Sequence, residues 1–332
     1  MAHVSIAIPV YNEAEVLTEL HRRLDAALAK LPHSFEIVFA DDGSTDETPA
    51  LLAELAAADP RVRVVRLSRN FGHQAATTAA FRHASGDAVV LMDADLQDPP
   101  EVISELIDAW SDGARVVLAR RRTRKETGLR GVLLKAFHPV YRWLSDSPIP
   151  SGVGSFSLLD RRAADELAAL PENNRYLPGL RWWIGFETRE VEYDRDEREA
   201  GRPSQTLGRL LRLGLDAIFS FSYKPLRAAT LLGLSVSAFS FTYAFVLIVL
   251  RLLEMNVVRG FTTQTVTTFF LGGVQLVFIG ILGEYLLRIL DEVKARPLYI
   301  VESVIGGSSE GDTDRSSTGP RDDGEADAEP GS

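Results

Sequence analysis

Two long uncharged apolar segments, residues 228–250 and 261–283, constrain the fold of this chain more than any other feature. Each runs for 23 residues without Asp, Glu, Lys or Arg. A helix of about 20 apolar residues crosses the hydrocarbon core of a bilayer. A helical hairpin buried in a soluble core is the alternative, but two uncharged runs of this length are rare outside bilayers. The sequence therefore predicts transmembrane helices over 228–250 and 261–287.

Basic residues flank the two segments. Lys224 and Arg227 precede the first, whereas Arg288, Lys294 and Arg296 follow the second. Positive charge near a span favours the cytoplasmic side. We expect no signal peptide at the start of the chain, because its first apolar run is too short for a secretory core. We therefore expect a multi-pass protein of the cell inner (plasma) membrane, with its N-terminal domain and both termini in the cytoplasm.

An amphipathic stretch, residues 205–227, leads into the first apolar segment. Its apolar side chains fall on one helical face, and Arg209, Arg212 and Asp216 fall on the other. A basic amphipathic helix beside a membrane span is typical of one that lies on the bilayer surface. A core-facing helix of a soluble protein is the alternative, but the neighbouring apolar segment favours the juxtamembrane interpretation.

The acidity of the chain is concentrated at its end. The formal net charge is −10, and residues 306–332 hold eight acidic residues against Arg315 and Arg321, which leaves −4 for residues 1–305. This last segment is rich in Gly, Ser, Asp and Glu, so we expect a disordered acidic tail. The charge argues against nucleic-acid binding, and the absence of cysteine excludes thiolate metal sites and cysteine nucleophiles.

The first 120 residues alternate between short apolar runs and helical patterns. This order predicts an α/β domain with a largely parallel sheet and helices on both faces. The expected strands are 4–10, 35–40, 62–67, 88–92 and 114–119, and the expected helices are 13–31, 48–58, 74–84 and 99–110.

Polar side chains gather just after the expected strands, at the edge where open α/β sheets bind ligands. Turn formation alone explains any one such cluster but is a weak explanation for all of them together. Asp93 and Asp95 follow an apolar strand and flank one residue, so that both carboxylates can meet one divalent cation. Mg²⁺ and Mn²⁺ prefer oxygen ligands, and Mg²⁺ is commonly held by one or two carboxylates plus substrate phosphates. The sequence therefore predicts a Mg²⁺ or Mn²⁺ site there.

Four motifs carry a resemblance that covers about residues 3–305. They are Ile8-Pro9-Val10-Tyr11-Asn12-Glu13, Asp41-Asp42-Gly43-Ser44-Thr45-Asp46, Arg69-Asn70-Phe71-Gly72 and Asp93-Ala94-Asp95-Leu96-Gln97-Asp98-Pro99-Pro100-Glu101. With them the chain resembles family 2 glycosyltransferases of the GT-A (Rossmann-like) fold, and among these the membrane-bound polyprenyl-phosphate glycosyltransferases related to dolichol-phosphate mannose synthase. The resemblance implies a GT-A domain over residues 1–204 and metal-dependent, inverting sugar transfer from a UDP- or GDP-linked donor to a polyprenyl phosphate, for cell-envelope glycosylation. It is also compatible with a homo-oligomer.

The resemblance implies roles for the matched residues. Asp93 and Asp95 would hold the metal and the donor diphosphate, and both count with Arg198 as catalytic. The implied nucleotide-sugar site comprises Pro9, Tyr11, Glu13, Asp42, Asp93 and Gln97, and the implied acceptor-phosphate site comprises Arg121, Arg124, Arg198 and Arg202.

The chain departs from the family pattern at two positions. Many relatives carry Asp where Ser155 stands, which puts a general base there in doubt; Asp160 is the alternative base, although a helix-start role suits it better. Relatives usually have Lys where Ser204 stands, and Arg202 is the candidate replacement.

Two other functions compete with this interpretation. A processive polysaccharide synthase shares the fold, but such enzymes usually carry Gln-x-x-Arg-Trp, and here Pro178 stands in the Gln position before Arg181-Trp182. A non-catalytic membrane scaffold with a degenerate transferase domain is the other, and the intact Asp42, Asp93 and Asp95 argue against it. His73 has no histidine partner at ligand spacing, so the sequence does not favour it as a metal ligand.

Overall fold

The computed structural model describes residues 1–122, 153–172, 175–194, 224–253 and 261–307. The predicted phosphate-binding residues Arg124, Arg198 and Arg202 lie outside these ranges. So do most of the predicted juxtamembrane helix (205–227) and nearly all of the predicted acidic tail (306–332), and both stay predictions.

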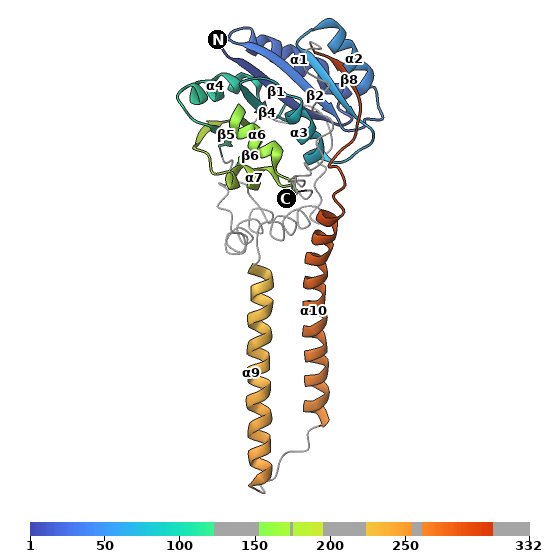
Figure 1. Ribbon diagram of the computed structural model, residues 1–332, viewed down its shortest axis with the longest axis vertical. Coiled ribbons are helices and arrows are strands. Elements are labelled where there is room, and N and C mark those ends of the chain that lie inside the picture. Colours follow the sequence, from blue (N-terminus) through green and yellow to red (C-terminus); the bar gives the residue numbers. More distant parts are fainter. Residues whose placement is uncertain (123–152, 173–174, 195–223, 254–260, 308–332) are drawn as a thin grey trace, which may run out of the picture.

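Within the described residues, eight strands form one mixed sheet at the head of the molecule (Figure 1). The strand order is β7-β5-β6-β4-β1-β2-β3-β8. The strands are β1 (His3–Val10), β2 (Ser34–Asp41), β3 (Val62–Leu67), β4 (Ala88–Leu91), β5 (Val116–Arg121), β6 (Val153–Asp160), β7 (Thr188–Tyr193) and β8 (Val301–Gly306).

Helices cover both faces of this sheet because apolar side chains alternate along the central strands. On β1, Ile6 and Ile8 point into one core and Ala7 points into the other. The first core is closed by α1 (Ala14–Leu28), α2 (Thr48–Ala58), the short 3₁₀ turn η1 (Pro100–Val102) and α4 (Ile103–Ser111). The second is closed by α3 (His73–Arg82), α6 (Arg161–Ala169) and α7 (Leu177–Trp183). The predicted α/β class is confirmed.

The sheet is parallel at its centre and antiparallel in two places. Strands β4, β1, β2 and β3 run parallel, whereas β6 runs antiparallel between β4 and β5. The last strand, β8, pairs antiparallel with β3 at the sheet edge. The sequence pattern did not predict β8, whose six residues follow a long helix far along the chain.

Two long helices, α9 (Lys224–Leu252) and α10 (Phe261–Val293), extend side by side away from the α/β domain (Figure 1). Phe270–Val293 is the one helical stretch among the described residues that is long and apolar enough to cross a membrane, and no part of it is buried. The predicted span 261–287 lies within α10, and the predicted span 228–250 lies within α9. Near the end of α10, Arg288 Nη2 lies 3.3 Å from Glu284 Oε1, an ion pair between residues four apart on one helix face.

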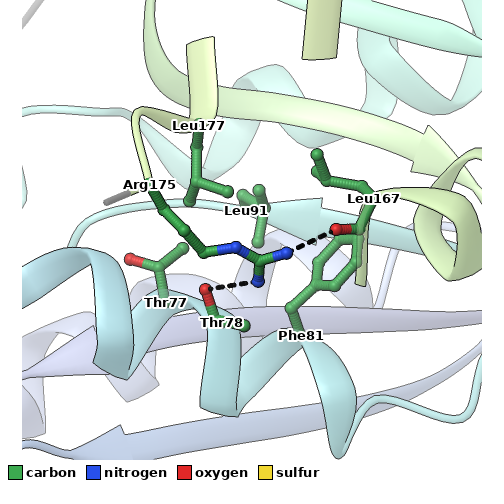
Figure 2. A pocket seen from close by; sticks show the side chains of 7 residues that line it. All are labelled: Thr77, Thr78, Phe81, Leu91, Leu167, Arg175 and Leu177. Atoms are coloured by element: carbon green, nitrogen blue, oxygen red, sulfur yellow. Dashed lines mark hydrogen bonds between the residues drawn. The ribbon is translucent and has the colours of Figure 1, made fainter. Parts of the chain in front are cut away.

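A buried arginine, Arg175, links α6 to α3 on the face of the sheet that both helices cover (Figure 2). The Arg175 guanidinium donates to the carbonyls of Leu167 at 2.9 Å and Leu170 at 2.7 Å, and to Thr78 Oγ1 at 3.3 Å. Burial lowers the pKa of Arg175. The guanidinium thereby satisfies carbonyls at the end of α6 that no helical amide reaches, and α7 begins two residues further on.

A network of charged residues joins α1 to the end of α2. It lies at the amino ends of the parallel strands, on the edge of the sheet opposite their carboxyl ends. Asp59 Oδ2 lies 2.7 Å from Arg61 Nη2 and 3.0 Å from His21 Nε2, and Arg61 also reaches Asp25 at 2.7 Å. The hydrogen bonds from Arg61, and then that from His21, hold the pKa of Asp59 well below its usual range. The ionised Asp59 therefore stabilises the folded state.

Asp59→Asn is expected to lower the free energy of unfolding by about 1–3 kcal/mol at neutral pH, because charged hydrogen bonds are lost from a nearly buried site. A depressed folded-state pKa contributes stability above the unfolded value of about 3.9 and loses it as the pH falls toward the folded value. The difference between variant and wild type should thus shrink below about pH 4, as measured by urea unfolding in detergent. Asp112→Asn, at an exposed carboxylate 3.9 Å from Arg189, is the control and should have little effect. A difference independent of pH would contradict the assignment.

Candidate active site

The carboxyl ends of the four central parallel strands meet at one edge of the sheet, as predicted. The residues that leave this edge come from the segments after β1, β2, β3 and β4. In open α/β sheets this edge is where ligands bind. The side chains there define the candidate site.

The segments after β1 and β2 hold each other in place. Asn12 has a positive φ of 53°, its N–H donates to Ser44 Oγ at 2.9 Å, and its Oδ1 accepts from the Thr45 N–H at 2.8 Å. The Glu13 N–H donates to Thr48 Oγ1 at 3.0 Å. Of the predicted nucleotide-binding residues here, Pro9 lies near the end of β1, and Tyr11 is 44% exposed beside it.

Gly43 brings the segment after β3 against the segment after β2. Its φ is +68°, and a Cβ at this position would lie 2.6 Å from the carbonyl carbon of Arg69. Only glycine fits such a conformation and such an approach. The resulting contact puts residues 69–72 beside Asp42.

Asp42 uses both carboxylate oxygens to fix that neighbouring segment. Oδ1 accepts from the Phe71 N–H at 2.7 Å, and Oδ2 accepts from the Gly72 N–H at 2.9 Å. Burial raises the pKa of Asp42, and the two amide hydrogen bonds oppose that shift. Gly72 has a φ of 100° and leads directly into α3. Whatever else it binds, Asp42 sets the position at which α3 begins.

Asp93 presents its two oxygens to different surroundings. Oδ2 accepts from the Ser155 hydroxyl at 2.9 Å. Oδ1 is buried and has no hydrogen-bond partner among the described residues. His73 Nε2, at the first position of α3, lies 3.6 Å from Oδ1. The Ser155 hydrogen bond therefore fixes the carboxylate and leaves the other oxygen for a ligand.

Asp95 and Gln97 lie on a strained turn after Asp93. The Gln97 N–H donates to Asp95 Oδ1 at 3.2 Å, and Leu96 between them has a positive φ of 57°. A left-handed conformation is uncommon for a bulky residue other than glycine. The hydrogen bond between Gln97 and Asp95 therefore fixes a turn in the segment that follows β4.

Ser155 is held by a buried arginine from α7. The Arg181 guanidinium donates to the carbonyls of Gly154 at 2.5 Å and Ser155 at 3.0 Å, and also to the Ser157 hydroxyl. Burial lowers the pKa of Arg181 to about 10. These hydrogen bonds hold the backbone of β6 in place, so that the Ser155 hydroxyl stays directed at Asp93.

Arg121, a predicted phosphate ligand, lies half-buried at the end of β5 and forms a triad with two buried residues, Tyr193 and Asp98. Its Nε donates to the Tyr193 hydroxyl at 3.1 Å, and its Nη2 lies 3.7 Å from Asp98 Oδ1. The Tyr193 hydroxyl donates to Asp98 Oδ1 at 2.5 Å. Burial alone would lower the pKa of Arg121, but the Tyr193 hydrogen bond and the Asp98 charge outweigh it and raise that pKa. The triad ties Arg121 to the turn that carries Asp95.

Asp160 has a structural role away from this edge. Its side chain caps α6 by accepting from the Arg162 N–H at 3.2 Å, and it also accepts from Trp110 at 3.2 Å and Arg115 at 2.7 Å. Because β6 runs antiparallel to β4, its end lies at the other edge of the sheet from Asp93. This geometry agrees with the helix-start role and does not support Asp160 as a general base.

A divalent cation fits the site as a partly protein-bound ion. Among the described residues, no three His, Asp or Glu side chains lie close enough together to form a complete metal site. The buried, unpartnered Oδ1 of Asp93 is nevertheless a ready ligand, and substrate phosphates commonly complete the coordination of Mg²⁺. The donor set therefore suits a cation that arrives with a diphosphate.

Three side chains that shape this site were not assigned to it from the sequence. Asp98 and Tyr193 had no predicted site role, and His73 was not favoured as a ligand. Their contacts join residues far apart in the chain, so no local spacing revealed them. The sequence held one weak indication for Tyr193. This residue is the last of a short strand-like run, and the predicted ligand residues also stand at or just after the ends of their strands.

A mixed α/β sheet of the GT-A type, with carboxylates at the ends of its parallel strands, defines the structural class of this domain. Residues 5–168 match the model of glycosyl transferase family 2. The chain also aligns along most of its length with curated members of this group, two of them at 41% and 42% identity. It therefore belongs to glycosyltransferase family 2, and it is an enzyme of the glycosyltransferase class.

Three similar proteins illustrate this relationship. The bactoprenol glucosyl transferase of Shigella phage SfII is 42% identical over 300 residues, which cover 90% of this chain and 97% of that protein. An uncharacterized glycosyltransferase of Bacillus subtilis (strain 168) is 41% identical over 303 residues, covering 91% and 94%. Among solved structures, a Pyrobaculum calidifontis mannosyltransferase in complex with GDP-Man and Mn²⁺ is 21% identical, with a TM-score of 0.45 over 68% of this chain and 64% of that one.

Proposed function

We propose that this enzyme transfers a sugar from a nucleotide-sugar to a polyprenyl phosphate, with inversion at the anomeric carbon and with the help of Mg²⁺ or Mn²⁺. The observation that carries the proposal is the state of Asp93. Its carboxylate is fixed by Ser155 at the ligand-binding edge of the sheet, and its second oxygen is left without a partner among the described residues. The name of the Shigella phage relative supports glucose as the sugar and bactoprenol phosphate as the acceptor.

The donor would lie across the edge of the central strands. Pro9, Tyr11, Glu13 and Asp42 would hold the nucleotide. Asp42 would do so from a fixed position, since both of its oxygens already accept backbone hydrogen bonds. The remaining donor ligands would be Asp93, Asp95 and Gln97. A bound cation would neutralise the negative charge of the departing nucleoside diphosphate.

The acceptor needs little proton chemistry from the protein. A phosphate monoester has a second pKa of about 6, so it is already an anionic nucleophile at neutral pH. This agrees with Ser155, a neutral hydroxyl, in a position where relatives carry a carboxylate. What the acceptor needs is orientation and positive charge. Arg121 would supply both within the described residues, and Arg124, Arg198 and Arg202 remain proposed partners.

A lipid-linked acceptor would explain why the chain has the two long apolar helices α9 and α10. We propose that both α9 and α10 span the bilayer and keep the α/β domain at the cytoplasmic surface. The strand β8 follows α10 and pairs with β3, so the chain returns from the hairpin to the same domain that it left. An even number of spans is consistent with that return.

The test is a direct assay of the full-length protein in detergent with Mn²⁺, a short polyprenyl phosphate, and either UDP-glucose or GDP-mannose. We expect one sugar to be added to the lipid, most efficiently from UDP-glucose, and mass spectrometry of the lipid product would show it. A long polymer would favour the processive alternative, and no nucleotide binding would favour the scaffold.

A further inference from the structure

We propose that His73 is a protein ligand of the divalent cation, bound through Nε2 on the same side as Asp93 Oδ1. The inference rests on the proposed function, since it concerns the cation that accompanies the donor diphosphate. It assigns a role to a side chain outside the Asp93-Ala94-Asp95 motif. His73 and Asp93 would be the two direct protein ligands, Asp95 would act through a bound water, and the diphosphate would complete the coordination, because no three His, Asp or Glu side chains of the described residues lie close enough together to hold the ion alone.

The first support is the geometry of the pair. His73 Nε2 and Asp93 Oδ1 lie 3.6 Å apart, beyond the distance of a good hydrogen bond. Two atoms that bind the same cation are held near each other without being bonded to each other. Asp93 Oδ1 is buried and lacks a hydrogen bond among the described residues, which is costly for a carboxylate oxygen unless a cation meets it.

The second support is the way in which both side chains are held. Asp93 cannot turn Oδ1 away without losing the Ser155 hydrogen bond to Oδ2 at 2.9 Å, and the Ser155 backbone is itself held by Arg181. His73 is the first residue of α3, whose start is fixed by the hydrogen bonds from the Phe71 and Gly72 amides to Asp42. Asp93 and His73 are thus positioned by separate sets of hydrogen bonds, and both sets leave the space between the imidazole and the carboxylate as the place for a shared ligand.

The third support is exposure. The His73 side chain is 51% exposed and the Asp93 side chain 25% exposed, so the pair lies where the edge of the sheet meets solvent, although Asp93 Oδ1 itself is covered. A histidine packed in the core, or a histidine in a closed structural metal site, would have a much smaller exposed fraction than His73. Both ions prefer oxygen ligands, but Mn²⁺, as a transition metal, accepts an imidazole nitrogen more readily than Mg²⁺ does, so a histidine ligand would favour Mn²⁺.

Pulsed electron paramagnetic resonance of Mn²⁺ tests the assignment on the full-length protein in detergent. Mn²⁺ is added with UDP, and in parallel with GDP, and the echo is examined for modulation by a coordinated ¹⁴N nucleus. We expect imidazole modulation in the wild type and its loss in His73→Ala, together with Mn²⁺ binding that is weaker by about tenfold. His83→Gln is the matched control: it changes the histidine at the other end of α3, where Nδ1 lies 2.8 Å from the Ala79 carbonyl, and should keep both signals.

The wild-type spectrum decides the question even if the variant is unstable. Mn²⁺–nucleotide binding and sugar transfer without ¹⁴N modulation would overturn the role of His73 and leave the proposed function intact. Modulation that persists in folded His73→Ala would overturn it equally. Failure of the wild type to bind Mn²⁺ with either nucleotide, together with absent transfer, would instead overturn the proposed function and this inference with it.

Discussion

Asp93→Asn is expected to lower the rate of sugar transfer to lipid phosphate by about 10³-fold, because it weakens the binding of the cation whose charge is worth several kcal/mol to the departing diphosphate. The shape of the side chain is kept, so the fold should be kept too. The Ser155 hydroxyl, 2.9 Å from Oδ2, favours the amide oxygen at that position. The amide nitrogen would then occupy the place of Oδ1 and repel a cation. Asp95→Asn should act in the same direction while preserving the turn in which Oδ1 accepts from Gln97.

The measurement is initial-rate transfer in detergent at saturating donor and Mn²⁺, with thermal unfolding recorded for each variant. Asp165→Asn is the control, because this exposed aspartate on α6 pairs only at the surface with Arg161, at 3.2 Å. It should leave transfer unchanged. Transfer within tenfold of wild type in folded Asp93→Asn and Asp95→Asn would refute the metal assignment.

The sequence was sufficient to predict the central part of the fold. All five predicted strands form, and no strand end differs from its predicted position by more than two residues; the predicted strands were 4–10, 35–40, 62–67, 88–92 and 114–119. The signal is strong there because buried parallel strands are continuous apolar runs that end at polar, turn-forming residues. The same property explains why Asp42 and Asp93 could be assigned to one edge of the sheet from the sequence alone.

Partners from distant strands could not be read from the same signal. The hydroxyl that fixes Asp93 comes from Ser155 on β6, and the imidazole beside it comes from the start of α3. Both contacts depend on strand order, in which β6 is inserted beside β4 in the antiparallel direction. A local pattern of apolar residues gives the direction of a side chain relative to its own strand, but not the identity of the neighbouring strand.

The strand β8 illustrates the same limit at the sheet edge. Its sequence, Val301–Gly306, is short and only partly apolar, and four of its six residues are exposed. What makes it a strand is pairing with β3, where Gly306 has a φ of +76° and a Cβ would lie 2.3 Å from the Val62 carbonyl oxygen. Tertiary pairing, and not local propensity, therefore determines this element.

Arg121→Ala is expected to lower kcat/KM for the lipid phosphate by about 10²-fold, because one charged hydrogen-bond donor to the reacting phosphate is lost. Donor and Mn²⁺ binding should change little, since the Asp93 contacts stay in place. Arg121 is not a free surface cation: Tyr193 and the fully buried Asp98 hold its guanidinium in position. Its removal leaves a buried carboxylate with one fewer cation, so some loss of stability accompanies the loss of activity.

Two further variants separate these effects. Arg121→Lys keeps the charge beside Asp98 but loses the forked donor geometry that suits phosphate, so it should fold normally and still be slow. Tyr193→Phe removes the hydroxyl that accepts from Arg121 at 3.1 Å and should raise KM for the lipid phosphate more than it lowers kcat, because the cation is present but poorly placed. One combination of results would contradict this role: Arg121→Lys and Tyr193→Phe both show wild-type kinetics toward the acceptor, and Arg121→Ala loses activity only to the extent that it loses stability. The triad of Arg121, Tyr193 and Asp98 would then stabilise the fold, and the acceptor phosphate would bind elsewhere.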